Sequence, residues 1–160
     1  MNDGERPEAT TVLQVIGPSD SGKTTLIERL LERLSGRLRV GTVKSIHHDV
    51  ELDTPGKDTH RHRSAGADTV VGVTPSGTFQ MQDRGKTDTE TEIDRLEEIL
   101  DRFVTDGYDV VLVEGFKSAS YPSIVLAEEA LVDDRTIAFG TDPDAIDLDA
   151  VVDLLGRQTA

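Results

Sequence analysis

The chain has 160 residues, with 31 acidic and 17 basic side chains and a formal net charge of −14. This length predicts one domain, and the absence of cysteine excludes disulfides and thiolate metal sites. The negative charge argues against nucleic acid and anionic membranes as partners, because both are held by lysine and arginine.

The ends of the chain and its apolar runs bear on location and domain organisation. No apolar run approaches the roughly 20 residues that span a bilayer. The polar, acidic start of the chain lacks the basic and apolar regions of a signal peptide. We therefore expect a cytoplasmic protein, with a flexible tail over residues 1–10 and a single nucleotide-binding domain over residues 11–160.

The composition also bears on the salt concentration at which the protein works. Only five of the 17 basic residues are lysines, and threonine and valine are abundant. An acidic, lysine-poor composition of this kind resembles that of proteins from halophiles that accumulate salt. At molar salt, screening shortens the repulsion between like charges to a few ångströms. We therefore interpret the protein as halophilic.

The apolar pattern predicts strands that alternate with helices. Thr11–Ile16 is a short β-branched run typical of a strand, and an amphipathic helical pattern follows from Lys23 to Ser35. The later elements are a strand over 39–43, a short helix over 58–66, a hairpin of 69–73 and 78–81, a helix after a Thr89–Glu92 capping box, strands over 109–113, 124–127 and 136–139, and a helix over 145–155. This order indicates an α/β fold, with a doubly wound, mostly parallel sheet, helices on both faces and a small β-hairpin.

Residues Gly17–Thr24 (GPSDSGKT) match the phosphate-loop pattern G-x-x-x-x-G-K-[ST] between the first predicted strand and helix. Glycines let the backbone curl so that its N–H groups face phosphate oxygens at the start of a helix. Lys23 supplies charge to the β and γ phosphates, and the Thr24 hydroxyl is a ligand for Mg²⁺. The pattern predicts a P-loop NTPase-like domain that binds phosphate through Gly17, Ser19, Asp20, Ser21, Gly22, Lys23, Thr24 and Thr25.

Acidic residues near the predicted carboxyl edge of the sheet are candidates for the metal and for catalysis. Glu114 directly follows the apolar strand DVVLV, and we assign it to the Mg²⁺ shell. Lys44, Asp49 and Asp53 lie in or beside the loop after the second strand, within reach of the phosphates. One of the two aspartates would hold the metal's water shell or orient the attacking water, but the spacing does not decide which. The predicted catalytic residues are Lys23, Asp49 and Asp53.

Four histidines cluster in the sequence, at positions 47, 48, 60 and 62. Neighbouring residues of a strand point to opposite faces, and residues two apart do not share a helix face. The i, i+4 spacing of paired helical metal ligands is missing. We therefore expect a polar role near the nucleotide, or plain exposure, rather than a metal site.

Several segments together resemble the MobB family, the GTP-binding adaptor of molybdopterin-guanine dinucleotide biosynthesis. The segments are GPSDSGKTT at 17–25, GTVKSIHHD at 41–49, DTPGKDTHRHRSAGA at 53–67 and LVEGFK at 112–117. The resemblance implies a homodimer that binds GTP and Mg²⁺, hydrolyses GTP slowly and works beside a MobA-type guanylyltransferase and its molybdopterin cofactor. It also implies that the second signature, which includes Lys57, lines the active-site cleft.

The origin of guanine specificity is open at the sequence level. The Asn-Lys-x-Asp stretch that many GTP-binding domains use is missing. The loop after the last predicted strand lies where a base-reading loop belongs, and its Asp142 is our candidate acceptor for the guanine N1 and N2 hydrogens.

Two other functions use a related fold. An ATP-dependent small-metabolite kinase needs an arginine-rich lid, and Arg61 and Arg63 form a close arginine pair outside the helices that carry the apolar pattern. A GTP-driven metallochaperone would use the histidine cluster, although it would lack cysteine ligands.

Overall fold

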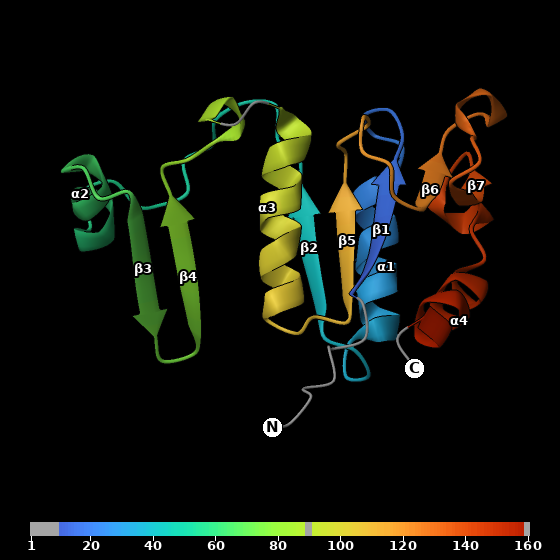
Figure 1. Ribbon diagram of the computed structural model, residues 1–160, viewed down its shortest axis with the longest axis horizontal. Coiled ribbons are helices and arrows are strands. Elements are labelled where there is room, and N and C mark those ends of the chain that lie inside the picture. Colours follow the sequence, from blue (N-terminus) through green and yellow to red (C-terminus); the bar gives the residue numbers. More distant parts are fainter. Residues whose placement is uncertain (1–9, 89–90, 159–160) are drawn as a thin grey trace, which may run out of the picture. The chain divides into compact units, whose positions relative to one another are not determined.

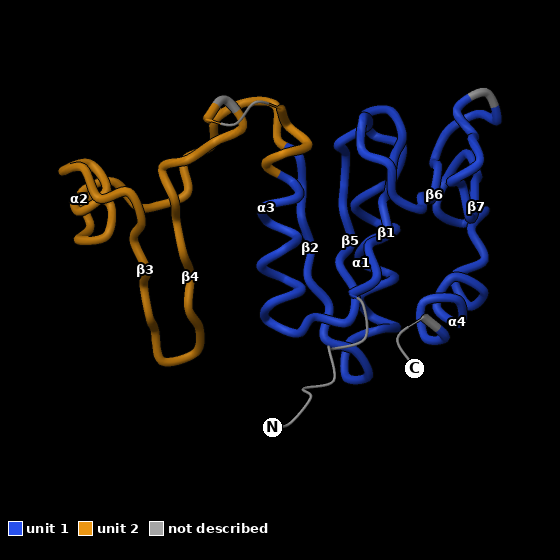
Figure 2. Tube along the Cα trace, in the orientation of Figure 1, with its two compact units in different colours: residues 1–45, 96–160 blue, residues 46–95 orange. Residues whose placement is uncertain are grey.

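The computed structural model describes residues 10–88 and 91–158 (Figure 1). The chain divides into two compact units, shown in two colours in Figure 2. The sheet unit contains residues up to 45 and from 96 onward, and the inserted unit contains residues 46–95. The predicted tail lies outside the described residues, apart from Thr10. The single domain expected over residues 11–160 stays a prediction.

Five parallel strands form the sheet unit, in the order β2-β5-β1-β6-β7. Their bounds are β1 Thr11–Ile16, β2 Val40–Lys44, β5 Val110–Glu114, β6 Ser123–Leu126 and β7 Thr136–Gly140. All five residues of β5 are buried, as expected for a continuous apolar strand that is covered on both faces. The predicted parallel sheet is confirmed, and β1 lies between β5 and β6.

Helices α1 (Lys23–Leu34) and α4 (Leu148–Gln158) share one apolar core with the sheet. Val110 and Leu112 of β5 belong to this core. Val111 and Val113 lie outside this core, because side chains alternate along a strand and these two point to the opposite face of the sheet. Helix α3 (Glu92–Thr105) packs on that second face (Figure 1), where the Phe103 ring lies against Gly41 of β2. The sheet is therefore doubly wound.

The inserted unit contains helix α2 (Asp58–Ser64) and the antiparallel hairpin of β3 (Thr69–Thr74) and β4 (Gly77–Gln82). The predicted hairpin is confirmed: Thr74 pairs with Gly77, and the Thr74 hydroxyl accepts the Gly77 N–H at 3.0 Å. A 3₁₀ turn η1 (Lys86–Asp88) follows. Val70 and Met81 are the unit's only buried apolar side chains among the described residues.

The last two helices each start at a capping side chain. Thr89 lies outside the described residues, and Thr91 caps α3 by accepting the Asp94 N–H at 3.1 Å. The final helix begins at Leu148, because residues 143–145 form a separate 3₁₀ turn η3 (Pro143–Ala145). A second cap, Asp147, accepts the Ala150 N–H at 3.0 Å and starts α4. A third 3₁₀ turn, η2 (Glu129–Leu131), follows β6.

Candidate functional site

The phosphate loop connects β1 to α1 in the context that its sequence predicts. Asp20 and Gly22 adopt left-handed backbone conformations, with φ of 61° and 94°, which turn the chain into the helix. The Lys23 Nζ donates to the carbonyl oxygens of Gly17 at 3.0 Å and Pro18 at 2.6 Å, so the ammonium lies over the curled backbone. Loop and lysine thus form one compact cationic feature at the carboxyl edge of the sheet.

Close packing explains why glycines stand at both ends of the loop. A Cβ on Gly17 would lie 2.4 Å from the Leu126 carbonyl oxygen, at the end of β6. A Cβ on Gly22 would lie 2.6 Å from Cγ of Pro143, in η3. Both approaches are far inside normal contact distance, so side chains at these positions would push the loop away from β6 and η3.

The residues of the loop fit a polyphosphate chemically. Within the described part of the chain, the Ser21 hydroxyl oxygen is buried without a hydrogen-bond partner, and a buried hydroxyl of this kind costs free energy until it is satisfied. Helix α1 has 12 residues and presents its unpaired N–H groups and positive dipole end to the loop. Lys23 adds a full charge, while Thr24 and Thr25 of the first helical turn are exposed.

Glu114 ends β5 and is in register with Val15 of β1, two residues before the loop. Its side chain is only 12% exposed, and the Lys44 Nζ lies 3.4 Å from its Oε1. Lys44 therefore partly compensates a carboxylate that would otherwise be costly to bury. Carboxylate and hydroxyl oxygens are ligands that Mg²⁺ prefers, so Glu114 and Thr24 fit the predicted metal shell.

The turn after Glu114 is held by a residue of β1 that the sequence reasoning missed, Gln14. Gly115 and Phe116 both have positive φ, 85° and 55°, and the buried Gln14 donates through Nε2 to both of their carbonyl oxygens, at 2.7 and 2.6 Å. A Cβ on Gly115 would lie 3.0 Å from the Ser45 Cβ. The available signal was a glutamine inside the apolar strand TVLQVI, because a buried amide needs partners.

Three further predicted site residues belong to the inserted unit. Asp49 is exposed, and so is Lys57 at the position before α2. Asp53 accepts the Thr54 N–H through Oδ1 at 2.8 Å, while its Oδ2 is buried without a partner within the described residues. All three residues lie in the segment between β2 and α2. Their roles toward the phosphates stay predictions.

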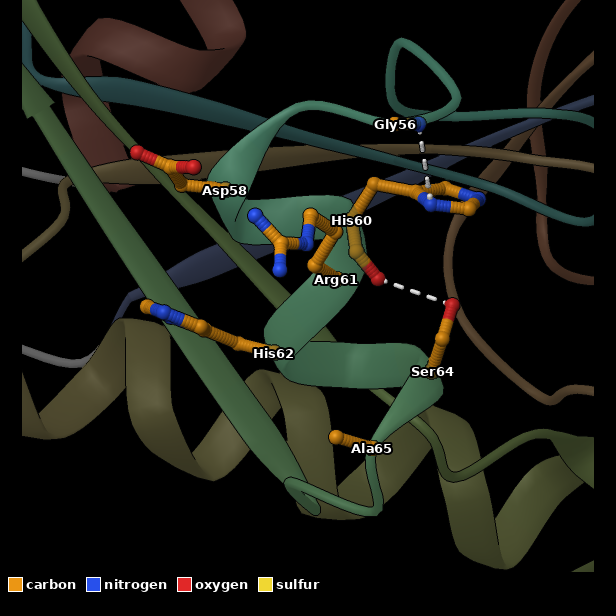
Figure 3. A pocket seen from close by; sticks show the side chains of 7 residues that line it. All are labelled: Gly56, Asp58, His60, Arg61, His62, Ser64 and Ala65. Carbon is orange, nitrogen blue, oxygen red and sulfur yellow. Dashed lines mark hydrogen bonds between the residues drawn. The ribbon is translucent and has the colours of Figure 1, made fainter.

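A cavity of about 720 Å³ surrounds α2 and is lined by Gly56, Asp58, His60, Arg61, His62, Ser64 and Ala65 (Figure 3). The His60 Nδ1 accepts the Gly56 N–H at 3.3 Å, and the Ser64 hydroxyl donates to the His60 carbonyl oxygen at 2.9 Å. In Figure 3, Arg61 and His62 point away from the His60 ring. The two histidines therefore do not converge on a common point.

The structure gives neither alternative function specific support. Within residues 10–88 and 91–158, no group of three His, Cys, Asp or Glu side chains is arranged to hold a metal ion. Arg63 is one of the two arginines considered for the lid of a kinase. Its side chain contacts the Met81 Sδ at 3.6 Å and so packs on the hairpin of its own unit.

The loop after β7 is tied closely to the phosphate loop. Asp142, the sequence-based candidate for reading guanine, accepts the Asp144 N–H through Oδ1 at 2.8 Å and caps η3. Asp144 in turn forms an ion pair with Arg29 of α1 at 2.8 Å. A cavity of about 580 Å³ lies beside residues 18–21 and is bounded by the end of β6, by η2 and by Thr141. Asp142 does not line that cavity, and its role toward guanine stays a prediction.

The chain resembles known proteins in its amino-acid sequence. None of the described helices has the length and apolar character needed to cross a membrane. Residues 12–152 match the family model described as molybdopterin guanine dinucleotide synthesis protein B. The chain is 36% identical over 133 residues to the molybdopterin-guanine dinucleotide biosynthesis adapter protein of Escherichia coli, covering 78% of this chain and 74% of that protein. It is 40% identical over 121 residues to a probable adapter protein of the same name from Bacillus subtilis, covering 74% of this chain and 65% of that protein.

Solved structures agree with the sequence comparison. A crystal structure of molybdopterin-guanine biosynthesis protein B superposes with a TM-score of 0.64 at 25% identity, covering 93% of this chain and 99% of that one. The crystal structure of Bacillus subtilis MobB superposes with a TM-score of 0.59 at 29% identity, covering 92% of this chain and 97% of the other. With a family match over residues 12–152 and a fold shared with solved members, the chain belongs to the molybdopterin guanine dinucleotide synthesis protein B family.

Proposed function

We propose that the protein is a cytoplasmic GTP-binding adaptor that assists a MobA-type guanylyltransferase in forming molybdopterin-guanine dinucleotide. The observation that carries this proposal is the phosphate loop with Lys23 folded over it, next to the strand that ends in the buried Glu114, in a chain that belongs to this family. The nucleotide that the protein binds is GTP with Mg²⁺. The molybdopterin cofactor is the substrate of the partner guanylyltransferase.

Slow GTP hydrolysis follows from the residues around the loop. Thr24 and Glu114 would hold Mg²⁺, which would neutralise charge on the phosphates when it is bound. Lys23 stabilises the charge that develops between the β and γ phosphates, and Asp49 or Asp53 orients the attacking water. We assign no histidine, glutamine or arginine to orient the water or to stabilise the transferred charge, and we therefore expect turnover to be slow. An adaptor needs nucleotide-dependent binding more than rapid turnover.

A homodimer is part of the proposal. The hairpin of the inserted unit exposes Val71, Val73 and Phe79 by 54%, 78% and 41%. A two-stranded hairpin is marginally stable by itself in water, and an exposed apolar strand surface favours pairing with another chain. Sedimentation of wild type against Val73→Thr tests this: the variant should shift toward monomer, and an unchanged dimer fraction would exclude this surface.

Titration calorimetry of GTP and ATP with Mg²⁺ in molar KCl tests nucleotide binding. Wild type should bind GTP in preference to ATP, and Lys23→Ala should lose that binding. Arg37→Ala is the control, because it removes one exposed positive charge in the turn between α1 and β2, at the amino end of the sheet. A preference for ATP, or GTP binding that survives Lys23→Ala, would refute the proposal.

The adaptor role needs its own assay. Synthesis of molybdopterin-guanine dinucleotide by a MobA-type enzyme should rise when the wild-type protein is added with GTP and Mg²⁺. Lys23→Ala should give no such increase, whereas Arg37→Ala should match wild type. Equal stimulation by Lys23→Ala would show that the nucleotide plays no part in the assistance.

A further inference from the structure

The cavity beside the phosphate loop has the place and the lining of a purine site. It is bounded by residues 18–21 of the loop, by Leu126 at the end of β6, by Ala127 and Glu128 after it, and by Leu131 and Thr141. Its volume of about 580 Å³ lies within the range of roughly 300–1,000 Å³ typical of small-molecule sites. We propose that the base of the bound nucleotide occupies this cavity and that Glu128 is the residue that selects guanine. This inference rests on the nucleotide binding proposed above.

The positions of the neighbouring strands decide on which side of the loop the nucleoside lies. β1 leads into the loop and has β5 on one side and β6 on the other. On the β5 side, Glu114 and its partner Lys44 fill the edge with the predicted metal site. On the β6 side the same loop borders the open cavity. A nucleotide whose phosphates lie in the loop therefore has room for its base toward β6 and β7.

The walls of the cavity are fixed to the loop by backbone packing. The Leu126 carbonyl lies so close to Gly17 that no Cβ fits between them, and Pro143 is equally close to Gly22. Gly140, just before Thr141, similarly packs on the Ala145 Cβ, which a Cβ of its own would approach to 2.6 Å. A base in this cavity would thus meet preformed walls, which reduces the entropy lost on binding.

An apolar surface and one carboxylate match the chemistry of guanine. Leu131 is 56% exposed although it lines a concave site, and with Ala127 it offers an apolar surface for a purine face. Glu128 is exposed, and its side chain makes no capping hydrogen bond to η2. An ionised carboxylate only accepts hydrogen bonds. Guanine presents two donors side by side, at N1 and N2, whereas adenine presents an acceptor at N1.

Asp142 is the rival carboxylate, and its geometry is less suitable. Asp142 does not line the cavity, and its Oδ1 accepts the Asp144 N–H and so caps η3. Glu128 carries no such task. If Glu128 selects guanine, its substitution should change the preference between GTP and XTP, whereas substitution of Asp142 should not.

The decisive experiment compares GTP, ITP, XTP and ATP by titration calorimetry with Mg²⁺, on wild type, Glu128→Gln, Asp142→Asn, Glu129→Gln and Lys23→Ala. ITP lacks the 2-amino group, and XTP carries a carbonyl oxygen there that a glutamine amide can donate to. Wild type should bind GTP about tenfold more tightly than ITP, the loss expected for one hydrogen bond to a charged group. Glu128→Gln should weaken GTP at least tenfold and strengthen XTP, while Glu129→Gln, one position along, should match wild type.

The outcomes separate the two proposals. An unchanged ratio of GTP to XTP affinity in Glu128→Gln overturns the assignment of Glu128, and a switch to XTP in Asp142→Asn assigns the selection to Asp142 instead. Nucleotide binding that does not depend on Lys23, or no binding in wild type, overturns the proposed function itself. Circular-dichroism melting of Glu128→Gln should match wild type, because the replaced side chain is exposed.

Discussion

The side-chain amide of Gln14 donates to the carbonyl oxygen of Phe116 at 2.6 Å and joins two strands at the site. Gln14 lies in β1, which leads into the phosphate loop, and Phe116 lies in the turn that follows Glu114. Phe116 has φ of 55°, a conformation that costs a non-glycine residue roughly 1–2 kcal/mol. The hydrogen bonds from Gln14 help to offset that cost and fix the direction in which Glu114 leaves the sheet.

We expect Gln14→Leu to lower the free energy of unfolding by about 1–3 kcal/mol, because the buried Phe116 carbonyl oxygen and the partly buried Gly115 carbonyl oxygen lose their donor. It should also weaken the Mg²⁺ dependence of nucleotide affinity, since the Glu114 carboxylate is no longer held in place. Denaturant titration measures the first effect, and calorimetry with Mg²⁺ and with EDTA measures the second. If stability falls while the affinity ratio between Mg²⁺ and EDTA is unchanged, Gln14 supports the fold without positioning Glu114.

Gly22 and Gly36 offer a matched pair for testing how tightly the loop packs. Both have positive φ, 94° and 83°, but a Cβ on Gly36 meets nothing within 4 Å, whereas one on Gly22 meets Pro143. Gly36→Ala should cost only the backbone strain, roughly 1 kcal/mol. Gly22→Ala should cost clearly more, because the loop or η3 must move. Equal losses in thermal or denaturant unfolding would mean that Pro143 yields freely, and Pro143→Ala should recover part of the loss in Gly22→Ala.

The Asp133–Arg135 pair predicts a small dependence of stability on acid pH. Hydrogen bonds from the Arg135 side chain and backbone lower the pKa of Asp133 below its ordinary value of 3.8. A lowered pKa in the folded protein means that the stabilisation is present above pH 3.8 and is lost as the pH falls through the folded pKa. The effect should be modest, because the pair is exposed to solvent. NMR titration of Asp133 gives the pKa directly, and Asp133→Asn should flatten the change in unfolding free energy in this acid range; an ordinary pKa would contradict the prediction.

The net charge of −14 predicts that the protein gains stability from salt. Raising KCl from about 0.1 M to molar concentration shortens the Debye length from about 10 to 3 Å and screens repulsion among the acidic residues. The unfolding midpoint should rise over this range, and it should rise equally with NaCl if screening is the cause. Highest stability at low salt would refute the halophilic interpretation of the composition.

The strands and the phosphate loop were predictable because their signals are local. A continuous apolar run such as DVVLV indicates a strand covered on both faces, and a glycine-rich loop between a strand and a helix specifies its own backbone shape. The Pro75–Gly77 turn predicted the hairpin for the same reason. The start of a helix is harder to predict where two capping residues lie close together in the sequence. Asp142 caps η3 and Asp147 caps α4, so α4 begins three residues later than predicted.

Contacts between residues far apart in the sequence were not predictable from it. Gln14 and Phe116 are 102 positions apart, and only the parallel register of β1 and β5 brings them together. The same holds for Glu128, whose place in the sequence is that of an ordinary surface residue and which only the position of β6 next to β1 brings to the cavity beside the phosphate loop. Such contacts depend on the order of strands in the sheet, which local propensity does not encode.

The unequal cores of the two units have a consequence for how the molecule opens. The sheet unit buries apolar side chains from three strands and three helices, whereas the inserted unit buries only Val70 and Met81 among its described residues. Segments with few buried apolar contacts open at low free energy, well below that of global unfolding. Amide hydrogens of β3 and β4 should therefore exchange with solvent sooner than those of β1 and β5. A segment that opens this readily can be ordered by whatever binds it, so binding at the inserted unit would appear first as slower exchange in the hairpin.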